Sequence, residues 1–257
     1  MLRIVGHEID PRLIIFDKDG TLIAFEPLWG TRFARLMEAL ETLTALGRDG
    51  RLGLAGTLGY DPETGEWDPR GPLTIASNTE VALLMASQLY RYRGMTWDEA
   101  LAMVAEAEEV SLAQSSLIDL VEPVGDVYAT LRRLHDRGLV LAVATTDDRE
   151  STEMALGKLG VLHLFAAVVC GDEGIRLKPA ADMAQEVCRR VGIAPGDAIM
   201  VGDAIVDMTM ARRAGLAYAV AVTSGPLSRE ALAAHADMVI PDIHAIEIVS
   251  SGEDEGP

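Results

Sequence analysis

Short apolar runs alternate with amphipathic segments through the second half of the chain. Residues 139–144 (LVLAVA) are continuously apolar, which is typical of a strand buried on both faces of a sheet. Before this run, Val127, Leu131 and Leu134 share one face of a predicted helix that ends at Gly138. The same alternation predicts further strands at 166–169, 198–201, 216–222 and 238–240, and helices at 150–159, 180–191 and 205–214. This order indicates an α/β fold, a Rossmann-like parallel sheet with helices on both faces.

The first strand of this sheet is expected much earlier, at residues 13–16 (LIIF), so a long insert separates it from the second strand. Residues 96–99 (TWDE) in the insert form a capping box, which predicts the start of a helix. Another helix is predicted by apolar residues that share one helical face: Phe33, Leu36, Met37, Leu40 and Leu43. The insert is therefore expected to be mostly helical.

Domain boundaries follow from the contrast between the alternating strands and helices of the sheet and the mostly helical pattern of the insert. We predict a core domain of residues 1–23 and 121–257 and a helical insert of residues 24–120. A Gly- and Pro-rich stretch near residues 51–72 interrupts the insert, and we expect turns or a small hairpin there. The acidic tail, residues 250–257, is expected to be disordered.

Composition and charge narrow the classes of function. Hydrophobic residues make up 49% and charged residues 24%, so 257 residues are expected to fold around a substantial core. The balance of 22 Lys+Arg against 40 Asp+Glu gives a net charge of −18. Such a chain repels nucleic-acid phosphates and anionic lipids, so we expect neither as a partner, and the oligomeric state stays open.

Cysteine usage and the N-terminus indicate a cytoplasmic setting. Cys170 and Cys188 are too few for a disulfide framework and lack zinc-site spacing, so we expect buried free thiols. The N-terminus has no basic start followed by a long apolar run, and no apolar run approaches the roughly 18 residues of a membrane span.

An acidic motif, DKDGT, directly follows the first predicted strand. Residues two apart in an extended segment point the same way, so we expect Asp17 and Asp19 to project together while Lys18 points aside. Ligands of open parallel sheets bind beyond the carboxyl ends of strands, where this pair would lie. Gly20 permits a sharp turn that leaves backbone N–H groups free for an anion. The alternative is an ordinary Asp-Gly turn after a strand.

A second acidic pair follows a later strand, in the segment VGDAIVD. Asp203 lies where the strand gives way to a helix, and Asp207 follows one helical turn later on the same face. Beside Asp17 and Asp19 they would make an oxygen-rich cluster suited to Mg²⁺. Alternatively, Asp203 is only an N-cap and Asp207 a solvated acid of the first turn.

Two weaker signals fall at the ends of other predicted elements. Thr145 and Thr146 end the strand that begins at residue 139 and offer a hydroxyl and a backbone amide to a phosphate oxygen. Lys178 precedes a proline that opens a helix, and it would supply the cation that a carboxylate-rich phosphate site needs. Each has an ordinary structural explanation when taken alone.

Taken together, the order DxDGT, strand-end Thr, Lys-Pro and GDxxxD resembles the haloacid dehalogenase superfamily, in particular its phosphatases similar to phosphoglycolate phosphatase. The resemblance covers the predicted core and extends through residues 208–225. It implies that the helical insert is the family's cap domain, which closes over the site and contacts the leaving group.

The resemblance also implies roles for individual residues. Asp17 resembles the nucleophile that forms an aspartyl-phosphate, and Asp19 the general acid and base. Asp17, the backbone carbonyl of Asp19, and Asp203 resemble the Mg²⁺ ligands. Asp207 is similar to the second acid of that motif, which acts on the water shell of the metal or on the lysine. Thr145, or Thr146 in the other register, and Lys178 resemble the residues that hold the phosphoryl oxygens.

Departures from the family pattern bear on the substrate. Family members often have Asn after the second-motif threonine, whereas this chain reads TTDD; we favour Thr145 because it ends the apolar run. The presence of Asp19 argues against the dehalogenases, and the absence of lysine from residues 24–120 argues against phosphonate hydrolases. The sequence thus predicts a Mg²⁺-dependent phosphatase for a small-molecule phosphate monoester such as phosphoglycolate or a sugar phosphate. A phosphomutase and a non-catalytic binding module are the alternatives.

Overall fold

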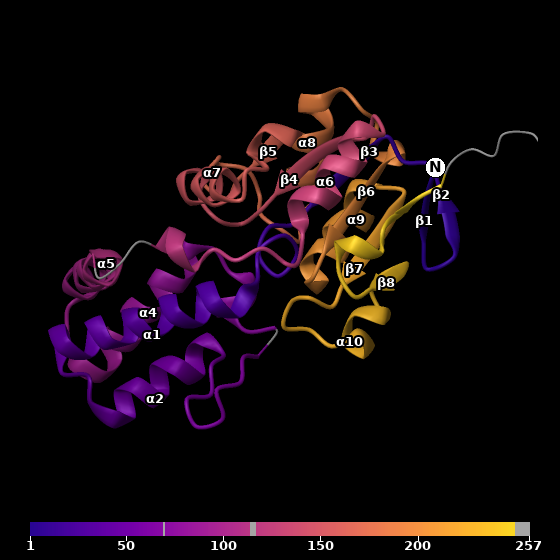
Figure 1. The fold of residues 1–257 in the computed structure, drawn as a ribbon. Coiled ribbons are helices and arrows are strands. Elements are labelled where there is room, and N and C mark those ends of the chain that lie inside the picture. Colours follow the sequence, from indigo (N-terminus) through magenta and orange to yellow (C-terminus); the bar gives the residue numbers. More distant parts are fainter. Residues whose placement is uncertain (69, 114–116, 250–257) are drawn as a thin grey trace, which may run out of the picture. The chain divides into compact units, whose positions relative to one another are not determined.

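The chain forms two compact units (Figure 1). The computed structural model describes residues 1–68, 70–113 and 117–249, so the predicted acidic tail lies outside the described residues. One unit consists of Met1–Ala24 and Pro123–Pro257, and the other of Phe25–Glu122.

A six-stranded parallel sheet forms the centre of the first unit, as the apolar runs predict. Its strand order is β5-β4-β3-β6-β7-β8, with every neighbouring pair parallel. The strands are β3 (Leu13–Phe16), β4 (Val140–Ala144), β5 (Phe165–Val169), β6 (Ala198–Gly202), β7 (Tyr218–Val222) and β8 (Met238–Ile240). Strand β7 begins later than predicted, because the N–H of Leu216 still donates to Ala211 O at the end of the preceding helix.

Helices flank this sheet, and alternate strand residues pack against them. Leu13 and Ile15 belong to a buried cluster that includes Met183 from α8 and Met208 from α9. Ile14 points to the opposite face, since successive strand residues alternate. The helices are α6 (Val127–Asp136), α7 (Arg149–Lys158), α8 (Asp182–Val191), α9 (Ile205–Ala214) and α10 (Arg229–Ala233), with short 3₁₀ turns at Leu162–Leu164, Pro195–Asp197 and Ile243–Ala245. The predicted α/β fold is therefore confirmed.

A small antiparallel sheet, which the sequence reading missed, lies at the N-terminus. Strand β1 (Leu2–Ile4) pairs with β2 (His7–Ile9) and with β9 (Glu247–Ile248). The hairpin turn uses Val5 and Gly6, both with positive φ, a feature of tight two-residue turns. The alternation of buried Leu2 and Ile4 with exposed Arg3 was the available signal.

The second unit is helical. It contains α1 (Phe25–Thr44), α2 (Gly47–Leu58), α3 (Pro72–Ile75), α4 (Asn78–Arg93), α5 (Trp97–Ala113) and a 3₁₀ turn at Leu117–Leu120. The predicted capping box at the start of α5 is confirmed, because Glu99 accepts from the N–H of Thr96 at 2.9 Å and Thr96 Oγ1 accepts from the N–H of Glu99 at 3.4 Å. The apolar face predicted around Leu40 lies on α1 and is buried against the other helices of this unit.

The expectation of turns throughout residues 51–72 is wrong for its first part, which continues α2 to Leu58. Buried Leu54 and Leu58 hold this helix against the unit's core, which outweighs the low helix propensity of its glycines. A Cβ at Gly53 would lie 2.6 Å from the hydroxyl of Tyr92 on α4, an exposed side chain that would have to shift. Turns begin only after α2, where an isolated antiparallel bridge pairs Tyr60 with Trp67.

Two further expectations concern the chain as a whole. Cys170 and Cys188 are free and buried, as predicted. Within the described residues, no helix is both long enough and apolar enough to cross a bilayer.

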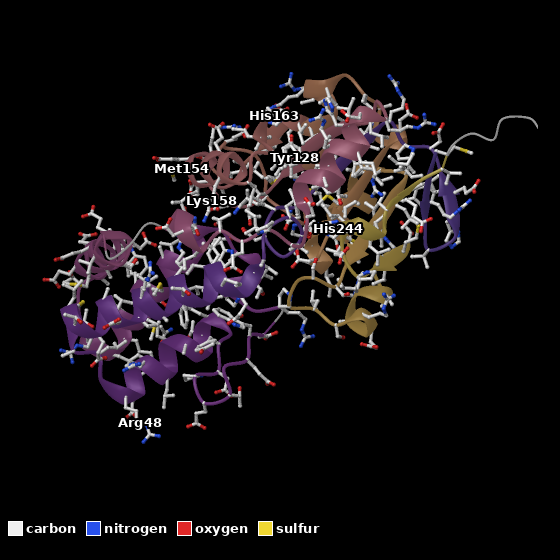
Figure 2. All side chains as sticks on the ribbon, in the orientation of Figure 1. Arg48, Tyr128, Met154, Lys158, His163 and His244 are labelled. Atoms are coloured by element: carbon white, nitrogen blue, oxygen red, sulfur yellow. The ribbon has the colours of Figure 1, made fainter. Side chains whose placement is uncertain are left out.

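The central strand should dominate the stability of the first unit. Ile15 is fully buried in β3, so Ile15→Ala is expected to lower the free energy of unfolding by about 2–5 kcal/mol, measured by urea denaturation. Met154 on α7 is 53% exposed (Figure 2), and Met154→Ala should change that free energy by less than about 0.5 kcal/mol. Equal losses in the two variants would contradict this assignment of the core.

Candidate active site

The loops after β4, β3 and β6 begin side by side, because these three strands are neighbours in the sheet. Phe16 at the end of β3 pairs with Val143 on one side and Val201 on the other. The N–H of Asp17 donates to Val201 O at 2.9 Å. The segments that carry the predicted site residues therefore meet at the carboxyl edge of the sheet, where open parallel sheets bind ligands.

Three aspartates form a carboxylate cluster at this edge. One carboxylate oxygen from each of Asp17, Asp203 and Asp207 lies within 4.8 Å of the others. Lys178, which precedes α8, places its Nζ 2.5 Å from Asp17 Oδ1 and 2.6 Å from Asp207 Oδ1. Asp17 is half-buried and the other three residues are buried. The structure thus brings together four of the residues that the motifs singled out.

Asp207 is a buried member of this carboxylate cluster. It lies in the first turn of α9, where its Oδ2 accepts from the N–H of Ala204 at 3.1 Å. Its Oδ1 faces Lys178, so both oxygens have partners, and the side chain is buried rather than solvated. The alternative of a solvated first-turn acid is therefore wrong, and Asp207 instead pairs with Lys178.

Asp203 is not the N-cap of α9, because Ala204 holds that position. Its side chain lies instead against two glycines. A Cβ at Gly20 or at Gly225 would lie 2.6 Å from Cγ of Asp203, so both positions require the absence of a side chain. Ser224 joins the two glycine segments, since its Oγ donates to Gly20 O at 2.6 Å. The sequence predicted no role for Gly225 or Ser224, because both residues lie outside the four motifs that carry the predicted site residues.

The electrostatics of the cluster indicate a deficit of positive charge. Burial raises the pKa of Asp203 well above its ordinary value, and repulsion from Asp17 and Asp207 raises this pKa further. Burial also raises the pKa of Asp17, against the opposing effect of Lys178. Burial alone would lower the pKa of Lys178, but the charges of Asp17 and Asp207 raise this pKa above its ordinary value.

The donor set fits a divalent cation. With all three carboxylates ionised, the single ammonium group of Lys178 would leave the cluster with two uncompensated negative charges. Carboxylate oxygens are the protein ligands that Mg²⁺ takes, and a divalent ion would offset this charge. Asp203 and Asp17 are better placed than Asp207 to hold such an ion, because Lys178 and a backbone N–H already engage both oxygens of Asp207.

Lys18 and Asp19 form a second charged group, and here the sequence reading was wrong. Lys18 does not point aside: both carboxylate oxygens of Asp19 lie 2.8 Å from its Nζ, and Asp147 Oδ2 lies 3.1 Å away. A four-carbon stem lets the ammonium group reach back across the chain after the strand has ended. Burial raises the pKa of Asp19, which the charge of Lys18 opposes. Burial lowers the pKa of Lys18, but Asp19 and Asp147 raise it above its ordinary value.

The four residues of the TTDD segment after β4 have different contacts: some hold the local structure, and others face the predicted site. Thr145 is buried, and its N–H donates to Val169 O at 3.0 Å, which leaves its hydroxyl and not its amide for a phosphate oxygen. Thr146 is half-buried next to it. Asp148 caps α7 by accepting from the N–H of Ser151 at 2.8 Å. Asp147, which no motif had singled out, is the second partner of Lys18.

The fold and the strand-end acids define a Rossmann-like α/β protein with a carboxylate site at the carboxyl edge of its sheet, and comparison with known proteins names the family. The sequence profile of the haloacid dehalogenase-like hydrolases matches residues 11–215. The chain therefore belongs to the haloacid dehalogenase-like hydrolase family, as the motif order predicts.

Three similar proteins illustrate the range of this family. Over 101 residues the chain is 34% identical to pyrophosphatase PpaX of Halalkalibacterium halodurans, a match that covers 39% of this chain and 47% of that one. Over 204 residues it is 28% identical to fructose-1-phosphate phosphatase YqaB of Escherichia coli, with 79% and 92% covered. A crystal structure of a predicted phosphoglycolate phosphatase from Haemophilus somnus has the same fold, with a TM-score of 0.70, 18% identity, and 92% and 96% covered.

The first of these matches are partial. The chain spans about half the length of the pyrophosphatase and phosphoglycolate phosphatase relatives that it matches at 28–34% identity.

The buried charge of Asp203 should reduce the stability of the protein without a metal. The folded-state pKa of Asp203 is raised, so the folded protein binds this proton more tightly than the unfolded chain does. The free energy of unfolding is therefore highest below the ordinary pKa of 3.8 and falls as pH rises through the raised value. In a chelator at pH 8, Asp203→Asn is therefore expected to melt above the wild type, by about 2–4 °C for each kcal/mol of repulsion removed. The difference should shrink toward pH 4.

A matched control is Asp197→Asn, which changes an exposed aspartate at the opposite end of β6. Its melting temperature should differ from the wild type by a small amount that does not grow with pH. The measurement is the melting temperature of all three proteins from pH 4 to pH 8 in a chelator. An Asp203→Asn protein that melts below the wild type at pH 8 would contradict the prediction that the charge of Asp203 destabilises the metal-free protein.

Proposed function

We propose that this protein is a Mg²⁺-dependent phosphatase that hydrolyses a small-molecule phosphate monoester through an aspartyl-phosphate on Asp17. The observation that carries the proposal is the position of Asp17, whose carboxylate lies 2.5 Å from the Lys178 ammonium group and within the carboxylate cluster. A nucleophile next to one buried cation and two further acids suits the transfer of an anionic phosphoryl group. Family membership and phosphatase relatives support the same reaction class.

The proposed reaction has two steps. In the first, a carboxylate oxygen of Asp17 attacks the phosphorus atom, the bond from phosphorus to the ester oxygen breaks, and Asp19 donates its proton to that leaving oxygen. In the second, Asp19 takes a proton from a water molecule whose oxygen attacks the same phosphorus atom. The bond from phosphorus to Asp17 then breaks, which releases inorganic phosphate and restores both carboxyl groups.

Asp17, Asp203 and the backbone carbonyl of Asp19 would hold the Mg²⁺ ion, with Asp207 acting on its water shell or through Lys178. When bound, the ion offsets carboxylate charge and stabilises the negative charge on the transferring group. Lys178 supplies the fixed cation for the phosphoryl oxygens, and the hydroxyl of Thr145, or of Thr146, donates to one of them. Asp207 keeps Lys178 in place through the 2.6 Å contact.

The helical unit Phe25–Glu122 is proposed to act as the cap that contacts the leaving group and so determines the substrate. Its lack of lysine argues against a phosphonate hydrolase, which would need a Schiff base from residues 24–120. Phosphoglycolate and sugar phosphates are the proposed candidates. The buried free thiols of Cys170 and Cys188 suit a reducing compartment, and we place the protein in the cytoplasm.

The proposed nucleophile gives the sharpest test. Asp17→Asn removes the attacking carboxylate while keeping its size, so turnover should fall below detection. The measurement is phosphate release with Mg²⁺ from a panel containing phosphoglycolate, fructose 1-phosphate, glucose 6-phosphate and p-nitrophenyl phosphate. The exposed control Asp197→Asn should retain wild-type rates. Near-wild-type activity of Asp17→Asn would overturn the proposal, and interconversion of sugar phosphates without phosphate release would instead indicate a phosphomutase.

Metal binding has a readout that is independent of turnover. Mg²⁺ should raise the melting temperature of the wild type, by an amount equivalent to about 2.7 kcal/mol at 100 times the Kd. Asp203→Asn should abolish most of this increase. Gly225→Ala should reduce it too, because the new methyl group displaces the Asp203 carboxylate. Gly196→Ala is the matched control, since a Cβ there meets nothing within 4 Å. A Mg²⁺-induced shift that all four proteins share would rule out this metal site.

A further inference from the structure

Lys18 is a buried cation that the proposed reaction does not use. Its side chain is 1% exposed, although it lies between the two aspartates of the DKDGT motif. Among the side chains that the structure describes, the lysines and arginines classed as buried are Lys18 and Lys178. Burying an ammonium group is costly unless charged partners surround it. The partners of Lys18 therefore indicate what this buried cation does.

The contacts of Lys18 match the capacity of an ammonium group. Such a group has three N–H donors, and three carboxylate oxygens surround its Nζ. Two belong to Asp19, at 2.8 Å each, and the third is Asp147 Oδ2, at 3.1 Å. The full donor set of Lys18 is therefore directed at one proposed acid and one further carboxylate.

Asp147 is itself held firmly by the backbone. Its Oδ1 accepts from the N–H of Asp148 at 2.9 Å, its carbonyl accepts from the N–H of Gly171 at 2.8 Å, and its own N–H donates to Thr145 Oγ1 at 3.2 Å. Gly171 also lets the loops approach closely, because a Cβ there would lie 2.7 Å from the carbonyl carbon of Thr146. Asp147 thus forms a fixed anchor on the loop after β4.

We propose that Lys18, anchored on Asp147, is a positioning residue that orients the Asp19 carboxyl group for proton transfer to the leaving oxygen and from the attacking water. This inference rests on the proposed function. Through Lys18, the loop that carries the proposed acid is tied to the loop that carries the proposed phosphate-binding threonine. A displacement of the acid by 1 Å is enough to cost about 10²-fold in rate.

The test replaces Lys18 by methionine and compares two leaving groups. An alkyl phosphate needs a proton on its leaving oxygen, whereas p-nitrophenolate leaves without one. Lys18→Met is therefore expected to lower kcat for the best alkyl ester by about 10²-fold. With p-nitrophenyl phosphate, formation of the aspartyl-phosphate should stay fast while its hydrolysis slows. Rapid mixing should then show a burst of p-nitrophenolate equal to the enzyme concentration, followed by slow turnover.

A variant of the anchor, Asp147→Asn, guards against a Lys18→Met protein that fails to fold. Asp147→Asn keeps the size of the anchor and should show the same substrate dependence with a smaller loss, roughly 10-fold. The double variant should be no slower than Lys18→Met alone, because the two residues act as one unit. Lys158→Met makes the same substitution at an exposed position on α7 (Figure 2) and should retain wild-type kinetics.

The outcomes separate this inference from the proposed function. A wild type that hydrolyses no ester, or an active Asp17→Asn, would overturn the phosphatase proposal together with the inference. An active wild type with an inactive Asp17→Asn would support the phosphatase proposal, and the Lys18→Met and Asp147→Asn kinetics would then test the positioning role of Lys18 separately. Equal losses for both leaving groups without a burst, or wild-type rates in both Lys18→Met and Asp147→Asn, would then overturn the positioning role of Lys18.

Discussion

The site depends on the compensation of clustered negative charge by two buried ammonium groups. Five carboxylates gather at one edge of the sheet, and each ammonium group lies between two of them: Lys178 between Asp17 and Asp207, and Lys18 between Asp19 and Asp147. Without these cations, like charges in a part-buried setting would drive the loops apart or hold the acids protonated. Among the residues that the structure describes, no ammonium group pairs with Asp203 in this way, and the raised pKa of Asp203 marks where further positive charge is needed.

Each lysine also connects chain segments that are distant in sequence. Lys178 joins the segment before α8 to the loop after β3 and to the first turn of α9, and Lys18 joins the loop after β3 to the loop after β4. The parallel sheet supplies the rigid base on which these loops begin side by side. The order of the strands therefore determines which loops lie side by side, and the ion pairs fix the distances between the charged groups on those loops.

Sequence patterns predicted the sheet well, because a strand buried on both faces leaves a continuous apolar run such as residues 13–16. They also predicted which acids follow those strands, although the chemical roles of these residues are proposals. The rule that strand neighbours point apart failed for Lys18, whose long stem lies beyond the end of the strand. Asp147 and Gly225 contribute only through tertiary contacts. Helix α2 was missed because its glycines suggest turns, whereas the burial of Leu54 and Leu58 that holds it depends on tertiary contacts.

The choice of lysine at both sites is itself informative. The chain has 22 Lys+Arg, of which three are lysines, and two of these three are the buried cations. Its arginines serve more exposed networks, in which Glu173 pairs with both Arg149 and Arg190. A guanidinium group is a planar fork suited to bidentate pairing, whereas an ammonium group is a compact charge with three rotatable donors. Three oxygens from two carboxylates around a single Nζ, as at Lys18, match the three donors of an ammonium group rather than the planar fork of a guanidinium group.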